Sequence, residues 1–208
     1  MTRFSWGGPD RLLRLEERFE GLPGWQAWKE LIEIVADPDT PNRELFDAFD
    51  YFLRSVDRID PNLVKDCVFI SHRQKDWRRA EEVAKIVSAT GRDYWLDIHD
   101  PMLLWINGTK TNIGTSAGAI LLAAIIEIAL LNSTHVITLH TANSAGSAWI
   151  PYELGRAKAR RIFSSNAAGW FDHPTILPAT CPEYLHLAHQ TLSDQDVEDW
   201  LRKRGRYN

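Results

Sequence analysis

The residues best suited to carry chemistry lie in one short segment, residues 144–156, which follows a strongly apolar stretch. Ser147 is of a type that caps helix N-termini, and Pro151 falls in the first turn, where proline is tolerated. Trp149 and Glu153 are spaced i, i+4, so a helix beginning here presents both side chains from one face. The apolar stretch predicts a strand, and the helix starts near its carboxyl end, where open α/β sheets bind ligands.

A carboxylate beside an indole at the edge of a sheet suits a ligand that has a ribose to hydrogen-bond and a flat base to stack. The alternative is structural: the segment is a capped helix in which Trp149 belongs to the core and Glu153 is solvated. Both interpretations are compatible with this segment by itself, so the elements around it have to decide between them.

Strand candidates alternate with helix candidates from residue 63 onward. Predicted strands lie at residues 64–70, 94–96 and 135–139, with weaker candidates at 161–163 and 175–178. Predicted helices run from a cap at Asp76 to Gly91, over residues 120–131, through Glu153, and from Ser193 toward the end of the chain. The buried faces expected for the first and last of them are Ala80, Val83, Ala84 and Val87, and Val197, Trp200 and Leu201. This alternation predicts an α/β fold with a central parallel sheet that helices cover on both faces.

Residues 1–62 have a different pattern, which predicts a small segment of short helices. Stretches rich in glycine and proline at residues 21–24 and 37–41 separate the helices. Thr40 and Pro41 suit the N-cap and first position of the last helix. Its apolar stripe consists of Leu45, Phe46, Phe49, Phe52, Leu53 and Val56. This aromatic surface indicates packing on the following domain or on a partner. The expected boundary divides a helical segment, 1–62, from a domain, 63–208.

The composition is that of a globular protein of 208 residues, 44% hydrophobic and 25% charged. A net charge of −4 gives no support for binding to nucleic acid or anionic membranes through overall charge. The apolar run at residues 113–131 is interrupted and contains Glu127, so a buried helix is expected rather than a membrane span. The first residues lack a signal-peptide core. Cys67 and Cys181 form no disulfide framework, so a reduced cytoplasmic setting is expected.

Four motifs occur in an order that resembles the Toll/interleukin-receptor (TIR) domain family. Asp66-Cys-Val-Phe-Ile-Ser-His72 resembles the family's first strand, and Leu96-Asp97 resembles the end of its second strand. Residues 125–139 resemble its passage from helix to strand. Ser147-Ala-Trp149 with Glu153 matches its pattern of serine, any residue, tryptophan, three residues and glutamate. The resemblance covers residues 66 to about 178 and implies a flavodoxin-like TIR fold.

Catalytic members of the TIR family cleave the nicotinamide–ribose bond of NAD, and the resemblance implies the same substrate here. The family's catalytic glutamate corresponds to Glu153, whose carboxylate can hold ribose hydroxyls and offset the charge of an oxocarbenium-like ribose. Ser71, His72 and Arg73 correspond to residues that line the substrate pocket, with Arg73 placed to pair a phosphate. Trp149 either packs the glutamate helix in place or contacts the substrate.

The loop that begins at Asp97 is expected to lie over the cleft, which makes Asp97 a further candidate for substrate binding. NAD is a substrate rather than a cofactor in this scheme. No metal is required, because nicotinamide leaves as a neutral pyridine. A small TIR protein of this kind resembles bacterial antiphage TIR proteins, including those of Thoeris systems. They make a cyclic ADP-ribose signal that activates a separate effector, and self-association through TIR contacts is also implied.

Three alternatives remain beside a cyclase. The chain could be a plain NAD glycohydrolase, a non-catalytic TIR adaptor, or an enzyme like the nucleoside deoxyribosyltransferases, which share the sheet and a catalytic glutamate. Residues 102–115 and Pro151 depart from the family's usual pattern. A metal site at His186 and His189, after Cys181, is not expected because carboxylate or cysteine ligands at the required spacing are missing.

Overall fold

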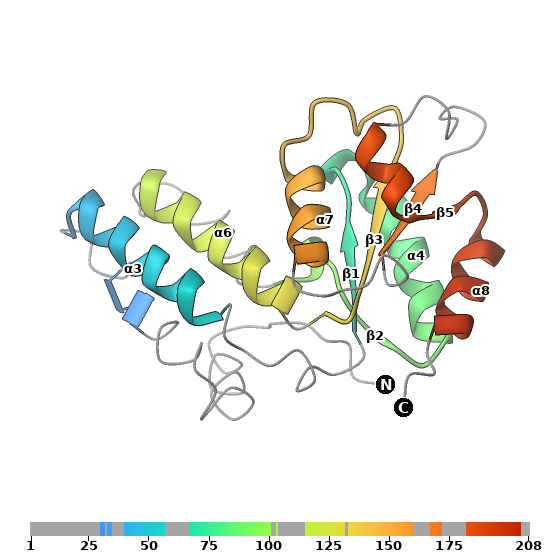
Figure 1. The fold of residues 1–208 in the computed structure, drawn as a ribbon, viewed down its shortest axis with the longest axis horizontal. Helices are drawn as coiled ribbons and strands as arrows, with labels where there is room; N and C mark the ends of the chain where they lie inside the picture. Colours follow the sequence, from blue (N-terminus) through green and yellow to red (C-terminus); the bar gives the residue numbers. More distant parts are fainter. Residues whose placement is uncertain are drawn as a thin grey trace. The chain divides into compact units, whose positions relative to one another are not determined.

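The computed structural model divides the chain into two compact units (Figure 1). It describes residues 30–31, 33–34, 40–56, 67–100, 103, 115–131, 133–159, 167–171 and 182–204. One unit comprises Met1–Phe4, Val64–Leu96 and Asn132–Asn208, and we call it the sheet unit. The other comprises Ser5–Leu63 and Asp97–Leu131, and we call it the helical unit. The predicted boundary between residues 62 and 63 falls outside the described residues and stays a prediction.

The sheet unit contains five parallel strands in the order β2-β1-β3-β4-β5. The strands are β1 (Cys67–Ser71), β2 (Asp93–Trp95), β3 (His135–His140), β4 (Ala167–Phe171) and β5 (His189–Thr191). This is the order of flavodoxin-like folds, in which the chain reverses its direction of winding between β1 and β3. All residues of β1, β3 and β4 are buried, as expected for a sheet covered on both faces. The predicted α/β class is therefore confirmed.

Helices cover both faces of this sheet (Figure 1). The helix α7 (Trp149–Ala159) lies on one face, where Leu154 packs with Ala167 and Phe171. The helices α4 (Trp77–Ala89) and α8 (Asp194–Arg204) lie on the other. On that face the guanidinium of Arg79 stands 4.1 Å from the ring centroid of Trp170. Because side chains alternate along a strand, Phe171 and its neighbour Trp170 necessarily point to opposite faces.

The predicted helices of the sheet unit are largely as expected. The buried face of α4 consists of the four residues predicted for it, and Gly91 follows the helix with φ of +85°. The hydroxyl of Ser193 accepts the N–H of Asp196 and caps α8, whose predicted apolar residues are all buried. The predicted cap at Asp76 is wrong, because this residue makes no side-chain capping bond to α4. Its carboxylate binds another loop instead.

Two strands were not predicted, and both have sequences with little strand character. The β4 sequence is Ala-Ala-Gly-Trp-Phe and the β5 sequence is His-Gln-Thr, so neither has the run of β-branched residues that marks a strand. Their place in the sheet depends on neighbours rather than on local propensity. The weak strands predicted at 161–163 and 175–178 lie outside the described residues.

In the helical unit, α3 (Asn42–Val56) packs against α6 (Thr115–Leu131). The predicted apolar stripe of α3 is partly wrong, since Phe52 is buried but the side chain of Phe46 is 58% exposed. The Thr40 hydroxyl donates to the carbonyl of Ile34, and no capping bond from it is seen among the described residues. The helix α6 is buried as predicted, with Glu127 inside. Within the described part of the chain, no helix combines the length and apolarity that crossing a membrane requires.

The same substitution is expected to have opposite effects at two glycines of the sheet unit. Gly91 has a left-handed backbone, so Gly91→Ala should lower the free energy of unfolding by roughly 1 kcal/mol. Gly155 lies inside α7 with open space around it, so Gly155→Ala should raise that free energy by about 0.5–1 kcal/mol. Urea denaturation of the two variants measures both values. Effects of the same sign would contradict the backbone assignment.

Candidate functional site

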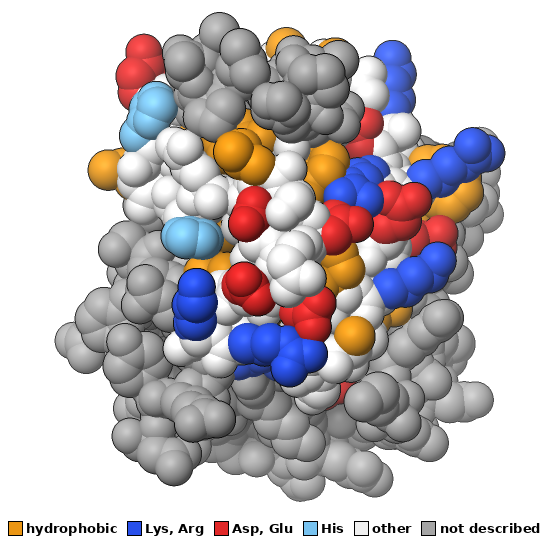
Figure 2. Space-filling view, turned by 90° about the vertical axis from the view of Figure 1, so that its right-hand side faces the viewer, with side chains coloured by type: hydrophobic (Ala, Val, Ile, Leu, Met, Phe, Trp, Pro, Cys, Tyr) orange, Lys and Arg blue, Asp and Glu red, His pale blue; other side chains and the backbone are white. Residues whose placement is uncertain are grey.

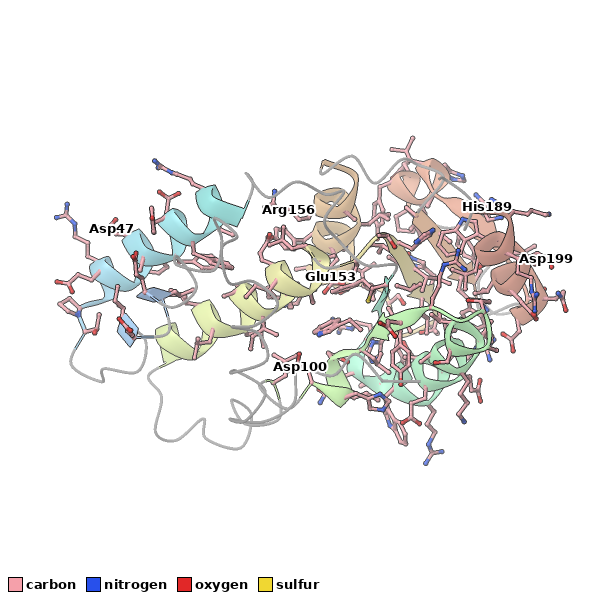
Figure 3. All side chains as sticks on the ribbon, turned by 90° about the horizontal axis from the view of Figure 1, so that it is seen from below. Asp47, Asp100, Glu153, Arg156, His189 and Asp199 are labelled. Atoms are coloured by element: carbon pink, nitrogen blue, oxygen red, sulfur yellow. The ribbon has the colours of Figure 1, made fainter. Side chains whose placement is uncertain are left out.

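The centre of the candidate site is a buried hydrogen bond between the first strand and the helix α7. The hydroxyl of Ser71, the last residue of β1, donates to Oε2 of Glu153, which lies 82 residues further along the chain. The side chains of Ser71 and Glu153 are only 2% and 7% exposed, respectively. Glu153 is labelled in Figure 3. The structure therefore joins two residues that the sequence predicted for one site. The alternative in which Glu153 is solvated is wrong.

Glu153 is buried because it lies in the apolar stripe of α7. Ile150, Leu154 and Ala157 recur at helical spacing and are buried against the sheet, and Glu153 falls between them. The helix starts as predicted, since the Ser147 hydroxyl accepts the N–H of Ile150 at 3.3 Å. An acidic residue in such a stripe needs a donor, and Ser71 is one donor that the sheet supplies.

Trp149 has an environment that differs from the core position required by the structural alternative, and its predicted role in packing the glutamate helix stays a prediction. Its side chain is 39% exposed, so it is not part of the core as the structural alternative required. The indole contacts Tyr152 edge-on, with ring centroids 5.7 Å apart. A role for Trp149 in substrate binding stays a prediction.

The remaining predicted residues lie at the end of β1 or in the helical unit. His72 and Arg73 follow Ser71 directly and are partly buried. Arg73 precedes the 3-10 helix η2 (Gln74–Asp76), with an extended backbone. Asp97 opens the short 3-10 helix η3 (Asp97–His99), where its carboxylate accepts the N–H of Ile98. The roles of these residues in binding stay predictions.

A polar network that the sequence did not predict surrounds the loop between β3 and α7. Asp76 lies in the 3-10 helix η2 (Gln74–Asp76), and its carboxylate accepts the Thr141 hydroxyl at 2.7 Å and the Asn143 amide at 2.6 Å. The Ser144 hydroxyl closes the loop by donating to the carbonyl of Leu139. The only sequence signal was a loop rich in threonine, asparagine and serine, since such side chains bind nearby backbone.

His140, at the carboxyl end of β3, is a second residue that the sequence analysis did not single out for the site. The Thr138 hydroxyl donates to the Ala168 carbonyl, so it accepts from Nε2 of His140, which lies 3.0 Å away. Burial lowers the pKa of His140 from 6.5 to about 4, so the imidazole is neutral near pH 7. Gly169 on β4 leaves room for the neighbouring Phe171 ring, since a Cβ there would lie 3.3 Å from it.

These side chains lie on one face and one edge of the sheet. Ser71 is paired in register with Thr138, and Thr138 with Gly169, so their side-chain positions share the α7 face. The edge is the carboxyl end of the strands at the reversal between β1 and β3, where ligands bind in such folds. A carboxylate fixed by a hydroxyl can accept hydrogen bonds from sugar hydroxyls and stabilise a neighbouring positive charge. The described residues contain no group of three or more potential metal-ligating His, Cys, Asp or Glu side chains.

A separate open pocket of about 510 Å³ lies beside β5 and α8. Figure 2 shows acidic and basic side chains intermixed on the molecular face that carries α8. Two acidic residues of the pocket form hydrogen bonds at the start of α8 or within it. Asp196 accepts the N–H of Leu192, and Asp199 accepts the side-chain amide of Gln195. The Leu192 N–H and the Ser193 hydroxyl hold the pKa of Asp196 below its usual value. Asp196 is therefore explained by bonds at the start of α8 and Asp199 by a bond within this helix. Two lining residues of the pocket, His189 and Asp199, are labelled in Figure 3.

Comparison of the chain with protein-family models, with curated proteins and with solved structures gives no match in any of the three. Functional inference therefore rests on the geometry of the sheet unit and on the sequence motifs. Of these motifs, the first strand and the segment with Glu153 are joined by a buried side-chain hydrogen bond, from Ser71 to Glu153.

Removing either partner of the Ser71–Glu153 bond should reveal strong coupling between them. Ser71→Ala should lower the free energy of unfolding by about 2 kcal/mol, because a buried carboxylate loses a donor. In a Glu153→Gln background the same change should cost at least ~1 kcal/mol less. Urea denaturation of the two single variants and the double variant measures the coupling. Additive effects would show that the bond does not stabilise the fold.

Stability should depend on pH through His140. The unfolded chain takes up a proton near pH 6.5 and the folded chain only near pH 4, so the folded state loses stability as the pH falls between these values. The full loss from this group is about 3 kcal/mol. His140→Gln keeps a donor toward Thr138 and removes the titration. The free energy of unfolding of this variant should therefore fall less than that of the wild type between pH 7 and pH 4.5. Parallel pH profiles would refute the assignment.

Proposed function

We propose that this chain is a TIR-type enzyme that cleaves the nicotinamide–ribose bond of NAD. The observation that supports this most directly is the buried Ser71–Glu153 bond at the carboxyl edge of a sheet with flavodoxin-like strand order. A carboxylate held at this edge is the group that stabilisation of an oxocarbenium-like ribose requires. The TIR-like motifs at residues 66–72 and 147–153 supply the link to NAD.

The proposed chemistry assigns each residue a role that its environment permits. Glu153 accepts hydrogen bonds from the ribose hydroxyls and offsets the positive charge that develops when nicotinamide leaves. Ser71 holds the carboxylate in one orientation, which lowers the reorganisation needed in the transition state. Arg73 pairs a phosphate of the dinucleotide, and His72 lines the same edge. Trp149 contacts another part of the substrate. No metal takes part.

The product that we propose is a cyclic ADP-ribose isomer. In this proposal a nucleophile of the bound molecule, rather than water, attacks the ribose carbon that nicotinamide leaves and closes the ring. The product then serves as a signal to a separate effector in antiphage defence, in the cytoplasm, and the enzyme self-associates through TIR contacts. A plain glycohydrolase would instead release linear ADP-ribose, so the ratio of the two products separates these functions.

A non-catalytic TIR scaffold is the second candidate function. The exposed aromatic pair Trp149 and Tyr152 at the start of α7 favours it, since exposed aromatic side chains are enriched at protein interfaces. In a scaffold, the Ser71–Glu153 bond would stabilise the fold without acting on a ligand. The two candidates therefore differ in what a change at Glu153 does to NAD.

Incubation of the purified protein with NAD, followed by mass spectrometry, tests the proposal. The wild type should release nicotinamide, and Glu153→Gln should do so at least about 100-fold more slowly, because the charge that stabilises the transition state is lost. Glu198→Gln, at an ion pair on α8, is the matched control and should retain full activity.

The assay has to include concentrated protein, so that an assembled state is also tested. If neither form consumes NAD and Glu153→Gln behaves as the wild type does, the enzymatic function is excluded and the scaffold is favoured. If the protein instead releases a deoxyribosyl product from added deoxynucleosides, its substrate is a deoxynucleoside rather than NAD.

A further inference from the structure

We propose that Asp76 is a positioning residue for Glu153, acting through the loop between β3 and α7; the inference rests on the proposed function. Asp76 lies in η2, a short distance beyond Ser71, and is buried. It occupies the N-cap position of α4, yet it makes no capping bond to that helix. A buried carboxylate needs hydrogen-bond donors, and because Asp76 makes no capping bond to α4, another part of the chain has to supply them.

That partner is the loop that leads into α7. Oδ2 of Asp76 accepts the hydroxyl of Thr141 at 2.7 Å, and Oδ1 accepts the side-chain amide of Asn143 at 2.6 Å. Hydrogen bonds to an ionised acceptor are about twice as strong as those between neutral groups. Asp76 therefore ties the loop after β1 to the loop after β3, across the reversal point of the sheet.

Inside the loop, the bonds continue from Thr141. Its hydroxyl oxygen accepts the N–H of Asn143 at 3.0 Å, which holds that residue's backbone toward Asp76. Its own N–H donates to the hydroxyl of Ser144 at 3.0 Å, and that hydroxyl donates to the carbonyl of Leu139 at 3.0 Å. The start of the loop is thus fixed on both sides, to η2 and to the end of β3.

The series of bonds then reaches α7. The carbonyl of Ser144 accepts the N–H of Ser147 at 3.2 Å, and Gly146 between them has φ of +73°. The Ser147 hydroxyl accepts the N–H of Ile150, in the first turn of the helix. Ile150 and Glu153 are spaced i, i+3 on one face, so a shift of Thr141 moves the start of the helix that carries the carboxylate.

Two side-chain hydrogen bonds therefore connect the end of β1 and η2 with the loop and helix that follow β3. One joins Ser71 to Glu153 directly, and the other joins Asp76 to Thr141. Removing the bond between Asp76 and Thr141 keeps the carboxylate of Glu153 but lets the helix that carries it move. The reaction should then slow at kcat, because small displacements of a catalytic group cost rate, while substrate binding through other contacts is kept.

Variants at Thr141 separate positioning from stability. Thr141→Val keeps the shape and removes the hydroxyl, and should lower kcat for NAD cleavage about tenfold with KM within about twofold. Thr141→Ser restores the hydroxyl and should keep kcat within about twofold of the wild type. Thr90→Val, which removes a hydroxyl bond to the carbonyl of Val87 at the end of α4, is the matched control and should not change kcat.

Hydrogen exchange of the amides at residues 141–150 gives a readout that does not need activity. Exchange should be faster in Thr141→Val and unchanged in Thr141→Ser and Thr90→Val. Wild-type kcat in Thr141→Val, or an equal fall of kcat in Thr90→Val, would overturn the positioning role. If the wild type cleaves no NAD, the proposed function fails. The hydrogen-exchange data then test the bond between Asp76 and Thr141 by themselves. Faster exchange only in Thr141→Val supports its role in fixing the loop, and equal exchange in all variants overturns that role.

Discussion

A carboxyl group buried at the edge of a sheet is the constraint on which the candidate site depends. A buried polar group is stable only where it finds hydrogen-bond partners, and Glu153 accepts a hydrogen bond from the hydroxyl of Ser71. That requirement fixes several things together: β1 has to end at Ser71, β3 has to lie beside it, and α7 has to turn its apolar stripe toward this face. The site is thus a consequence of the strand order, since the strand order places the two segments together.

β1 and β3 both carry polar residues toward their carboxyl ends. The first residues of β1 and the middle of β3 are apolar, whereas Ser71, Thr138 and His140 bring hydroxyls and an imidazole toward the carboxyl edge. All three are buried, and those hydroxyls and the imidazole nitrogen form hydrogen bonds. Polar groups placed this way usually reduce stability compared with apolar ones, and proteins retain such arrangements at functional sites.

The opposite face of the sheet has a different construction. The guanidinium of Arg79 lies over the ring of Trp170 and also forms ion pairs with Glu82 and Asp194, so it links α4, β4 and α8. The ring of Trp200 on α8 meets His135 at the start of β3 edge-on, with centroids 5.6 Å apart. Aromatic and cationic side chains therefore hold this face together, while the face with α7 carries the buried carboxylate. One face of the sheet is thus held by stabilising contacts, and the other carries the candidate site.

The sequence by itself determined the features that depend on local pattern: β1 and β3, the apolar face of α4, the cap at Ser147 and the position of the helix with Glu153 directly after a strand. Periodicity and capping report these because each depends on residues within a few positions of one another. Tertiary structure alone decided that Asp76 binds Thr141 rather than α4, that Trp149 is exposed, that His140 is buried and neutral, and that β4 and β5 are strands. For Asp76, His140, β4 and β5 the deciding neighbours are distant in the chain, and hydrogen-bond partners and burial at that range are set by which strands lie side by side.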